Sequence, residues 1–193
     1  MIRSTWFRDL FLDPPASAGS GRAVAAPVAG FAASSMLLAC ATQTGAAESI
    51  AEATREQLEM AGIYAHMVDF HDLNLALLER SSQVLFVVST TFDGDPPDMG
   101  EAFFRSAMQH PATLTHLQYG VLALGDRAYD QFCGFGHKLD DWLRASGARS
   151  WFDLIEVDDE DEQAIDRWHG QVACLLARKG DSGPAFSPSS DHA

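Results

Sequence analysis

Cysteine and paired metal-ligand spacings are scarce in this sequence of 193 residues. The three cysteines, Cys40, Cys133 and Cys174, are an odd number without CxxC spacing, and no two histidines stand in HxxxH spacing. The sequence therefore predicts neither a disulfide framework nor a metal site, and it favours a reducing compartment, which we expect to be the cytoplasm.

Positive charge is in deficit. The chain has 27 Asp and Glu against 13 Lys and Arg, which gives a formal net charge of −14. Phosphates and anionic lipids repel such a surface, so we expect neither nucleic acid nor a membrane as a main partner. The charge is compatible with a partner protein that has a basic docking face, but solubility is the first explanation of the charge alone.

Residues 23–47 contain no charged side chain, and a stretch of that length could cross a bilayer. Its composition of mostly Ala, Gly, Ser and Thr, with Pro27, predicts no span. The letters "LLAC" at 37–40 resemble a lipoprotein cleavage box, so a lipid anchor or membrane tether through the N-terminal extension remains the alternative.

Composition favours one globular domain, with 47% hydrophobic and 21% charged residues. Residues 1–34, rich in Pro, Gly and Ala, are predicted to be an N-terminal extension or linker, and 180–193 a disordered tail. The domain is predicted to occupy residues 35–179.

Apolar runs and helical spacings alternate through this domain. Strands are predicted at 35–41, 63–69, 83–90, 117–125 and 151–158, and helices at 46–62, 73–81, 100–110, 130–147 and 161–179. In the first helix we expect Ile50, Ala53, Leu58 and Ala61 on the buried face. This alternation predicts an α/β fold, a five-stranded parallel sheet with helices on both faces. Ligands bind such sheets at the carboxyl ends of the strands, so the loops after the first, third and fourth strands are the candidates.

The first of these loops, "TQTGAAES" from Thr42 to Ser49, joins a strand to the start of a helix. Hydroxyls, Gln43, Gly45 and small side chains there predict a cradle for a phosphate, which the helix dipole would favour. The loop has neither the Walker A nor the GxGxxG pattern, so the phosphate would be bound and not transferred. An ordinary helix cap is the alternative.

The other two loops each carry an aromatic residue. "STTFDGDPPDMG" (Ser89–Gly100) contains Phe92, and "LGDRAYDQFCGFG" (Leu124–Gly136) contains Tyr129. Two rings above a phosphate cradle predict a flat ring system held by stacking. Alternatively, both rings cover the end of the core.

Together the three loops resemble those of the flavodoxin-like FMN domain of the diflavin reductase family, the sulfite reductase flavoprotein and NADPH–cytochrome reductase type. The family's loops read roughly "GSQTGTAE", "STYGEGDPPDNA" and "GLGDxxYxHFCxxGKxxD", against "ATQTGAAE", "STTFDGDPPDMG" and "ALGDRAYDQFCGFGHKLD" here. The similarity covers about residues 36–178. It implies a flavodoxin-like sheet of strand order 2-1-3-4-5 and FMN as the cofactor.

The resemblance also implies the residues of the site. Those matching the phosphate loop are Thr42, Gln43, Thr44, Gly45, Ala46 and Ala47; those matching the loop against the flavin ring are Ser89, Thr90, Thr91, Phe92 and Gly94; and those matching the third loop are Gly125, Asp126, Tyr129 and Phe132. Tyr129 is expected to stack on the isoalloxazine ring. No catalytic residue is expected.

Two departures from the family pattern stand in the site. Ala41 replaces the usual Gly before the phosphate loop, and Thr91–Phe92 stands where Tyr–Gly is common. Either Thr91 or Phe92 therefore faces the flavin on that side.

The implied function is electron transfer. Such a domain relays electrons from a reductase module with FAD and NAD(P)H to a haem, sirohaem or similar acceptor, and we do not expect this chain alone to oxidise NADPH. The alternatives on the same fold are a small FMN-dependent NAD(P)H:quinone-type reductase and an interaction module without flavin.

Residues 150–163 carry seven acids and no base. These are Asp153, Glu156, Asp158, Asp159, Glu160, Asp161 and Glu162. Acids at the start of the last helix favour its dipole, which accounts for two or three of them. The others are predicted to steer a basic redox partner to the flavin edge.

Overall fold

The computed structural model describes residues 35–91, 93–159 and 161–180. The extension predicted at 1–34 and residues 181–193 of the predicted tail lie outside them, as do Phe92 and Glu160. The last helix ends at Gly180, the first residue that the sequence analysis assigned to the tail.

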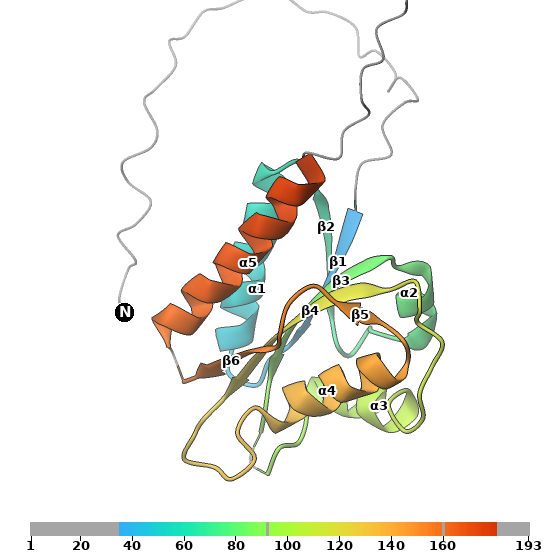
Figure 1. The fold of residues 1–193 in the computed structure, drawn as a ribbon. Helices are drawn as coiled ribbons and strands as arrows, with labels where there is room; N and C mark the ends of the chain where they lie inside the picture. The colour runs from blue at the N-terminus through green and yellow to red at the C-terminus, as the bar shows by residue number, and fades with distance from the viewer. Residues whose placement is uncertain (1–34, 92, 160, 181–193) are drawn as a thin grey trace, which may run out of the picture. The chain divides into compact units, whose positions relative to one another are not determined.

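A single parallel sheet forms the centre of the domain (Figure 1). Its strands are β1 (Ser35–Ala41), β2 (Tyr64–Asp69), β3 (Gln83–Ser89), β4 (Gln118–Gly125), β5 (Arg149–Ser150) and β6 (Ile155–Asp158). The order is β2-β1-β3-β4, and both β5 and β6 pair with β4 on the side away from β3. This confirms the predicted α/β fold and the order 2-1-3-4-5, with β5 and β6 sharing the fifth position.

The fifth strand was predicted as one run at 151–158, but the structure has two short strands in its place, β5 and β6. Trp151 still donates its backbone N–H to the Tyr119 carbonyl (2.9 Å), but residues 151–154 then leave the ladder. The Phe152 ring packs edge-on against Trp168, with centroids 5.7 Å apart, and covers Gly120, where an added Cβ would lie 2.6 Å from that ring. Packing of one aromatic ring therefore divides the strand.

Helices cover both faces of the sheet (Figure 1). Helices α1 (Ala46–Met60) and α5 (Glu162–Gly180) pack on one face, and α2 (Leu75–Arg80), α3 (Asp98–Ser106) and α4 (Gly134–Ala145) contribute to the core on the other. The central strands alternate between these two cores: Leu85 and Val87 face α1 and α5, whereas Phe86 and Val88 face α3 and α4. Strands buried on both faces explain the continuous apolar run in β3.

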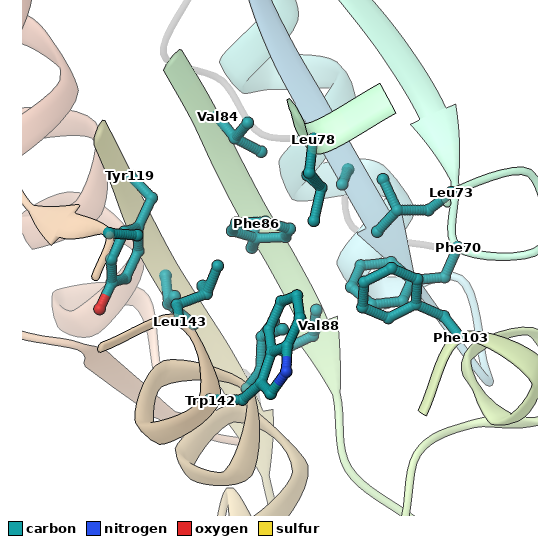
Figure 2. Packing of buried hydrophobic residues seen from close by; sticks show 14 of the residues in the cluster. Phe70, Leu73, Leu78, Val84, Phe86, Val88, Phe103, Tyr119, Trp142 and Leu143 are labelled. Atoms are coloured by element: carbon teal, nitrogen blue, oxygen red, sulfur yellow. The ribbon is translucent and has the colours of Figure 1, made fainter. Parts of the chain in front are cut away.

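Aromatic rings fill the second core (Figure 2). Phe70 packs edge-to-face against Phe103, with ring centroids 5.6 Å apart and planes at 80°, and Phe103 does the same against Trp142 at 5.7 Å and 88°. These contacts join α3 to α4, and Phe70 also packs against Phe86 on β3, with ring centroids 6.1 Å apart.

The buried face of α1 is only partly the predicted one. Ile50 and Leu58 are buried, but Ala53 and Ala61 are exposed, and Thr54 takes the inner position. The Thr54 hydroxyl donates to the Ile50 carbonyl (2.8 Å) and accepts from the indole N–H of Trp168 (2.9 Å). A satisfied polar residue thus joins α1 to α5, and a purely hydrophobic pattern cannot identify it.

Two helices begin a few residues away from their predicted first residues. Helix α3 begins at Asp98 and not at Gly100, and α4 begins at Gly134 and not near Asp130, because Cys133 adopts a left-handed backbone (φ 53°) that ends the preceding turn.

Part of the stretch without charged residues (23–47) forms strand β1. The "LLAC" letters at 37–40 lie within this strand, where Cys40 is buried. No helix in the described part of the chain is long and apolar enough to cross a bilayer.

Candidate functional site

The loop after β1 leads directly into α1. Thr42 Oγ1 accepts a hydrogen bond from the backbone N–H of Gly45 (2.8 Å), and Gly45, with φ +92°, occupies the left-handed region that favours glycine. Gly45 caps α1 without any side-chain hydrogen bond. Since the first N–H groups of a helix have no partner within it, they are open to an anion here. The geometry fits the predicted phosphate cradle.

The loop after β3 forms a tight hairpin. The backbones of Thr91 and Asp95 exchange two hydrogen bonds, of 2.9 and 3.1 Å, and Gly94 N–H donates to the Thr91 carbonyl (3.1 Å). Gly94 has φ +85°, as the left-handed residue of a three-residue hairpin requires. The neighbouring Thr90 hydroxyl accepts from the Phe135 N–H at the start of α4 (3.2 Å). Thus the hairpin is fixed to the helix that follows the third loop.

The loop after β4 turns sharply at Gly125. A Cβ on this residue would lie 2.6 Å from the Cys133 nitrogen, so only glycine fits. Asp126 Oδ1 accepts from the Ala128 N–H (2.7 Å), and Tyr129 N–H donates to the Asp126 carbonyl (3.1 Å). This turn presents Tyr129 with 48% of its surface exposed.

The three loops enclose a cavity of about 310 Å³ at the carboxyl edge of the sheet, within the usual range for small-molecule sites. Its position flanks the switch between β1 and β3, where a sheet of this order binds ligands. The predicted residues that line it are Gln43, Thr44, Ala46, Ser89, Thr90, Thr91, Gly125, Asp126 and Tyr129.

The other predicted residues stand outside the lining. Thr42 and Gly45 shape the cradle from behind, Ala47 is buried in α1, and Gly94 packs against Gln131, whose Cβ would be 2.8 Å from an added Cβ. Phe132 lies beneath the Arg127 guanidinium, whose carbon is 4.3 Å from the ring centroid. Phe92 is outside the described residues, so Thr91, whose hydroxyl donates to the Asp95 and Pro96 carbonyls (3.2 Å each), is the residue seen to line that side.

Four lining residues were not predicted: Leu124, Gln131, Cys133 and Asp159. Asp159 adopts φ 53° and donates its N–H to the Gly125 carbonyl (2.9 Å), which brings the segment after β6 to the cavity. Its signal in the sequence is weak, since aspartate in a left-handed turn has no distinctive spacing.

Charge in the cavity is one-sided. Asp126 and Asp159 line it, and no lysine or arginine does so among the described residues. A phosphate there would therefore be held by backbone N–H groups and hydroxyls, as the composition of the first loop predicts.

Cys133 is a packing residue in the third loop. The buried thiol donates to the Ala123 carbonyl (3.1 Å), and burial raises its pKa to about 12. Since the thiolate is the nucleophilic form, Cys133 is not reactive at neutral pH.

These features fit FMN. The uncapped start of α1 suits its phosphate, the cavity between the three loops can receive a ring, and Tyr129 supplies a partly exposed aromatic side chain. A bound FMN would supply one- and two-electron redox chemistry, and the protein would bind, orient and shield it.

The fold and the site define a flavodoxin-type domain. The sequence model of the flavodoxin family matches residues 38–168, and the chain belongs to this family. It is similar to the sulfite reductase [NADPH] flavoprotein alpha-component of Vibrio parahaemolyticus (33% identity over 156 residues, 80% of this chain and 25% of that protein). It is also similar to NADPH oxidoreductase A of Dictyostelium discoideum (33% over 147 residues, 75% and 23%). The chain spans about a quarter of the length of these relatives.

Solved structures agree on the fold. A flavodoxin of Streptococcus pneumoniae superimposes with a TM-score of 0.65 at 23% identity, covering 75% of this chain and 99% of that one. A Pseudomonas aeruginosa flavodoxin variant gives 0.63 at 24%, covering 74% and 99%. The resemblance to the FMN domain of diflavin reductases is therefore confirmed: the chain is an electron-transfer module of the flavodoxin type with FMN as its cofactor.

Proposed function

We propose that this chain relays electrons through FMN from a reductase module carrying FAD and NAD(P)H to a redox acceptor protein with a basic docking face. The observation that carries the proposal is the position of the cavity: it opens at the carboxyl edge beside the exposed Tyr129, and Asp159 of the acidic segment (residues 150–163) lines it. Relatives named as NADPH oxidoreductase and sulfite reductase flavoprotein support a reductase and a redox acceptor as partners.

NADPH oxidation is proposed to belong to the longer system. The relatives are about three times as long as this chain, and their NADPH-dependent activities are those of the whole proteins. We therefore expect the 193 residues to accept electrons only when a reductase is supplied. We propose the cytoplasm as the compartment, because all three thiols are free and Cys174 is exposed.

The acidic segment divides into two groups. Glu156 and Asp158 on β6 are already paired: Arg127 Nε lies 3.4 Å from Asp158 Oδ2, and His137 Nε2 lies 2.8 Å from Glu156 Oε1. Arg127 in turn rests on Phe132. These acids fix the third loop to β6 and offer less free charge to a partner.

The second group is exposed and has no ion pair among the described residues. It comprises Asp153, Asp159, Asp161 and Glu162. Asp161 also caps α5, since its Oδ1 accepts from the Gln163 N–H (2.9 Å). Asp159 lines the cavity, so Asp153 and Glu162, which do not line it, are the acids chosen to test docking.

Electron transfer to a basic haem acceptor such as cytochrome c, driven by an added reductase, is expected to slow steeply between low and physiological salt. Exposed charges act over roughly 8 Å at 0.15 M ionic strength, so salt screens the attraction. The variant Asp153→Asn/Glu162→Gln is expected to lower the low-salt rate roughly threefold to tenfold, with FMN affinity unchanged. Stopped-flow absorbance of the acceptor measures the rate.

The matched control is Glu56→Gln/Glu79→Gln, which removes two exposed acids from α1 and α2. It loses the same charge and is expected to keep most of the rate. An electron-transfer rate that does not change with salt concentration, or that falls equally in both double variants, would contradict docking at the acidic segment.

A further inference from the structure

Lys138 binds the loop after β3, which forms one side of the cavity, but Lys138 itself does not line the cavity. Its ammonium donates a hydrogen bond to the Gly94 carbonyl at 2.8 Å and lies 3.6 Å from Asp95 Oδ1. Both partners belong to the Thr91–Asp95 hairpin, whose first residue lines the cavity. A charged donor makes this a stronger bond than one between neutral groups.

The start of α4 packs closely against the hairpin. Gly134, at the start of α4, lies so close that an added Cβ would be 2.7 Å from Gly94 Cα, and Lys138 stands one turn further along the same helix. The ammonium also lies 5.8 Å from the centroid of the Phe104 ring on α3. Helices α3 and α4 therefore both position the side chain that binds the hairpin.

The position of Gly94 makes this contact consequential. Gly94 is buried and left-handed, and it lies in a short hairpin in which one residue pair, Thr91 and Asp95, exchanges two backbone hydrogen bonds. If the ammonium is removed, the carbonyl loses its side-chain donor. Among the described residues, the hairpin then keeps the backbone bonds between Thr91, Gly94 and Asp95 and the bonds from the Thr91 hydroxyl to the Asp95 and Pro96 carbonyls. Such a short segment opens at a low free-energy cost.

We propose that Lys138 is a positioning residue that fixes the Thr91–Asp95 hairpin as a wall of the FMN cavity. It acts through the Gly94 carbonyl and touches neither cavity nor cofactor. The expected effect on FMN affinity rests on the proposed function, whereas the contact between Lys138 and Gly94 is present in the protein without flavin.

The test compares Lys138→Met, Lys138→Arg and a control, Arg149→Met, in the full chain. Arg149 is an exposed cation on β5, which pairs with the start of β4 at the other end of the sheet. In the protein without flavin, amide hydrogen exchange at Gly94 and Asp95 is expected to be roughly tenfold faster in Lys138→Met, since the lost bond has a charged donor. FMN affinity is expected to fall roughly fivefold. Lys138→Arg is expected to restore most of both, and Arg149→Met to change neither.

Each outcome decides the proposal. Unchanged exchange at Gly94 and Asp95 in Lys138→Met would overturn it, and so would faster exchange with unchanged FMN affinity, because the wall would then not matter. A loss of affinity that arginine does not rescue would also contradict positioning. If the unsubstituted chain binds no FMN, the proposed function fails, while the exchange measurement still decides the contact. Should Lys138→Met fail to fold, Lys138→Gln takes its place, because glutamine keeps a hydrogen-bond donor but has no charge. Amide hydrogen exchange at Gly94 and Asp95 is then expected to be faster than in the unsubstituted chain, though less so than for Lys138→Met. Exchange equal to that of the unsubstituted chain would overturn the role of the charge.

Discussion

Replacing Tyr129 by alanine is expected to weaken FMN binding by about 1–3 kcal/mol, the free energy of a lost stacking contact together with its apolar area. This corresponds to a dissociation constant raised roughly 5- to 150-fold. Tyr129 is the aromatic ring that lines the cavity among the described residues, and 48% of its surface is exposed without ligand. Titration of the protein without flavin, followed by quenching of FMN fluorescence, measures the change.

Tyr129→Phe is the matched control, because it keeps the ring and removes only the hydroxyl. It is expected to bind FMN nearly as well as the unsubstituted chain. Since the ring is half exposed, neither substitution should lower the midpoint of thermal unfolding of the flavin-free protein appreciably. An affinity indifferent to Tyr129→Ala would mean that the third loop does not present this ring to the flavin.

Gly136→Ala is expected to lower the free energy of unfolding by about 1–3 kcal/mol, the usual cost of overpacking a close contact. An added Cβ would lie 2.3 Å from the Cβ of Ala123 and 3.4 Å from its Cα, so α4 would have to move away from β4. Such a shift would also displace the third loop, which ends where α4 begins at Gly134. Urea unfolding followed by circular dichroism measures the loss.

Gly170→Ala is the matched control, a second helical glycine on α5 where an added Cβ meets nothing within 4 Å. Alanine there is expected to stabilise the chain by up to about 1 kcal/mol through helix propensity. The two substitutions should therefore have opposite signs. A neutral or stabilising Gly136→Ala would contradict the close packing of α4 on β4.

The sequence was informative where one pattern has one physical cause. The apolar run of β3 predicted a strand buried on both faces, and Val87 and Val88 indeed face opposite cores. Likewise, small and hydroxyl residues before a helix predicted the cradle at Thr42–Gly45, because only such a loop leaves backbone N–H groups accessible.

Features set by long-range contacts could not be predicted in this way. Thr54 is buried because Trp168, more than a hundred residues later, donates to its hydroxyl. Phe152 leaves the strand pattern because it packs over Gly120. Asp159 reaches the cavity through one backbone bond to Gly125, and Lys138 reaches Gly94 from a helix whose spacing marks it only as a surface position. In each case the partner is distant in sequence, so local periodicity contains no information about it.

The most direct test of the account is a parallel titration of the flavin-free protein with FMN and with FAD. The start of α1 closes the phosphate cradle, so we expect it to accept a terminal phosphate and to disfavour one that continues into an adenylate. The account predicts about one FMN bound per chain, with its fluorescence quenched, and far weaker binding of FAD. Equal affinity for the two flavins would contradict the phosphate cradle, and no binding of either would contradict the assignment of this chain as an FMN electron-transfer module.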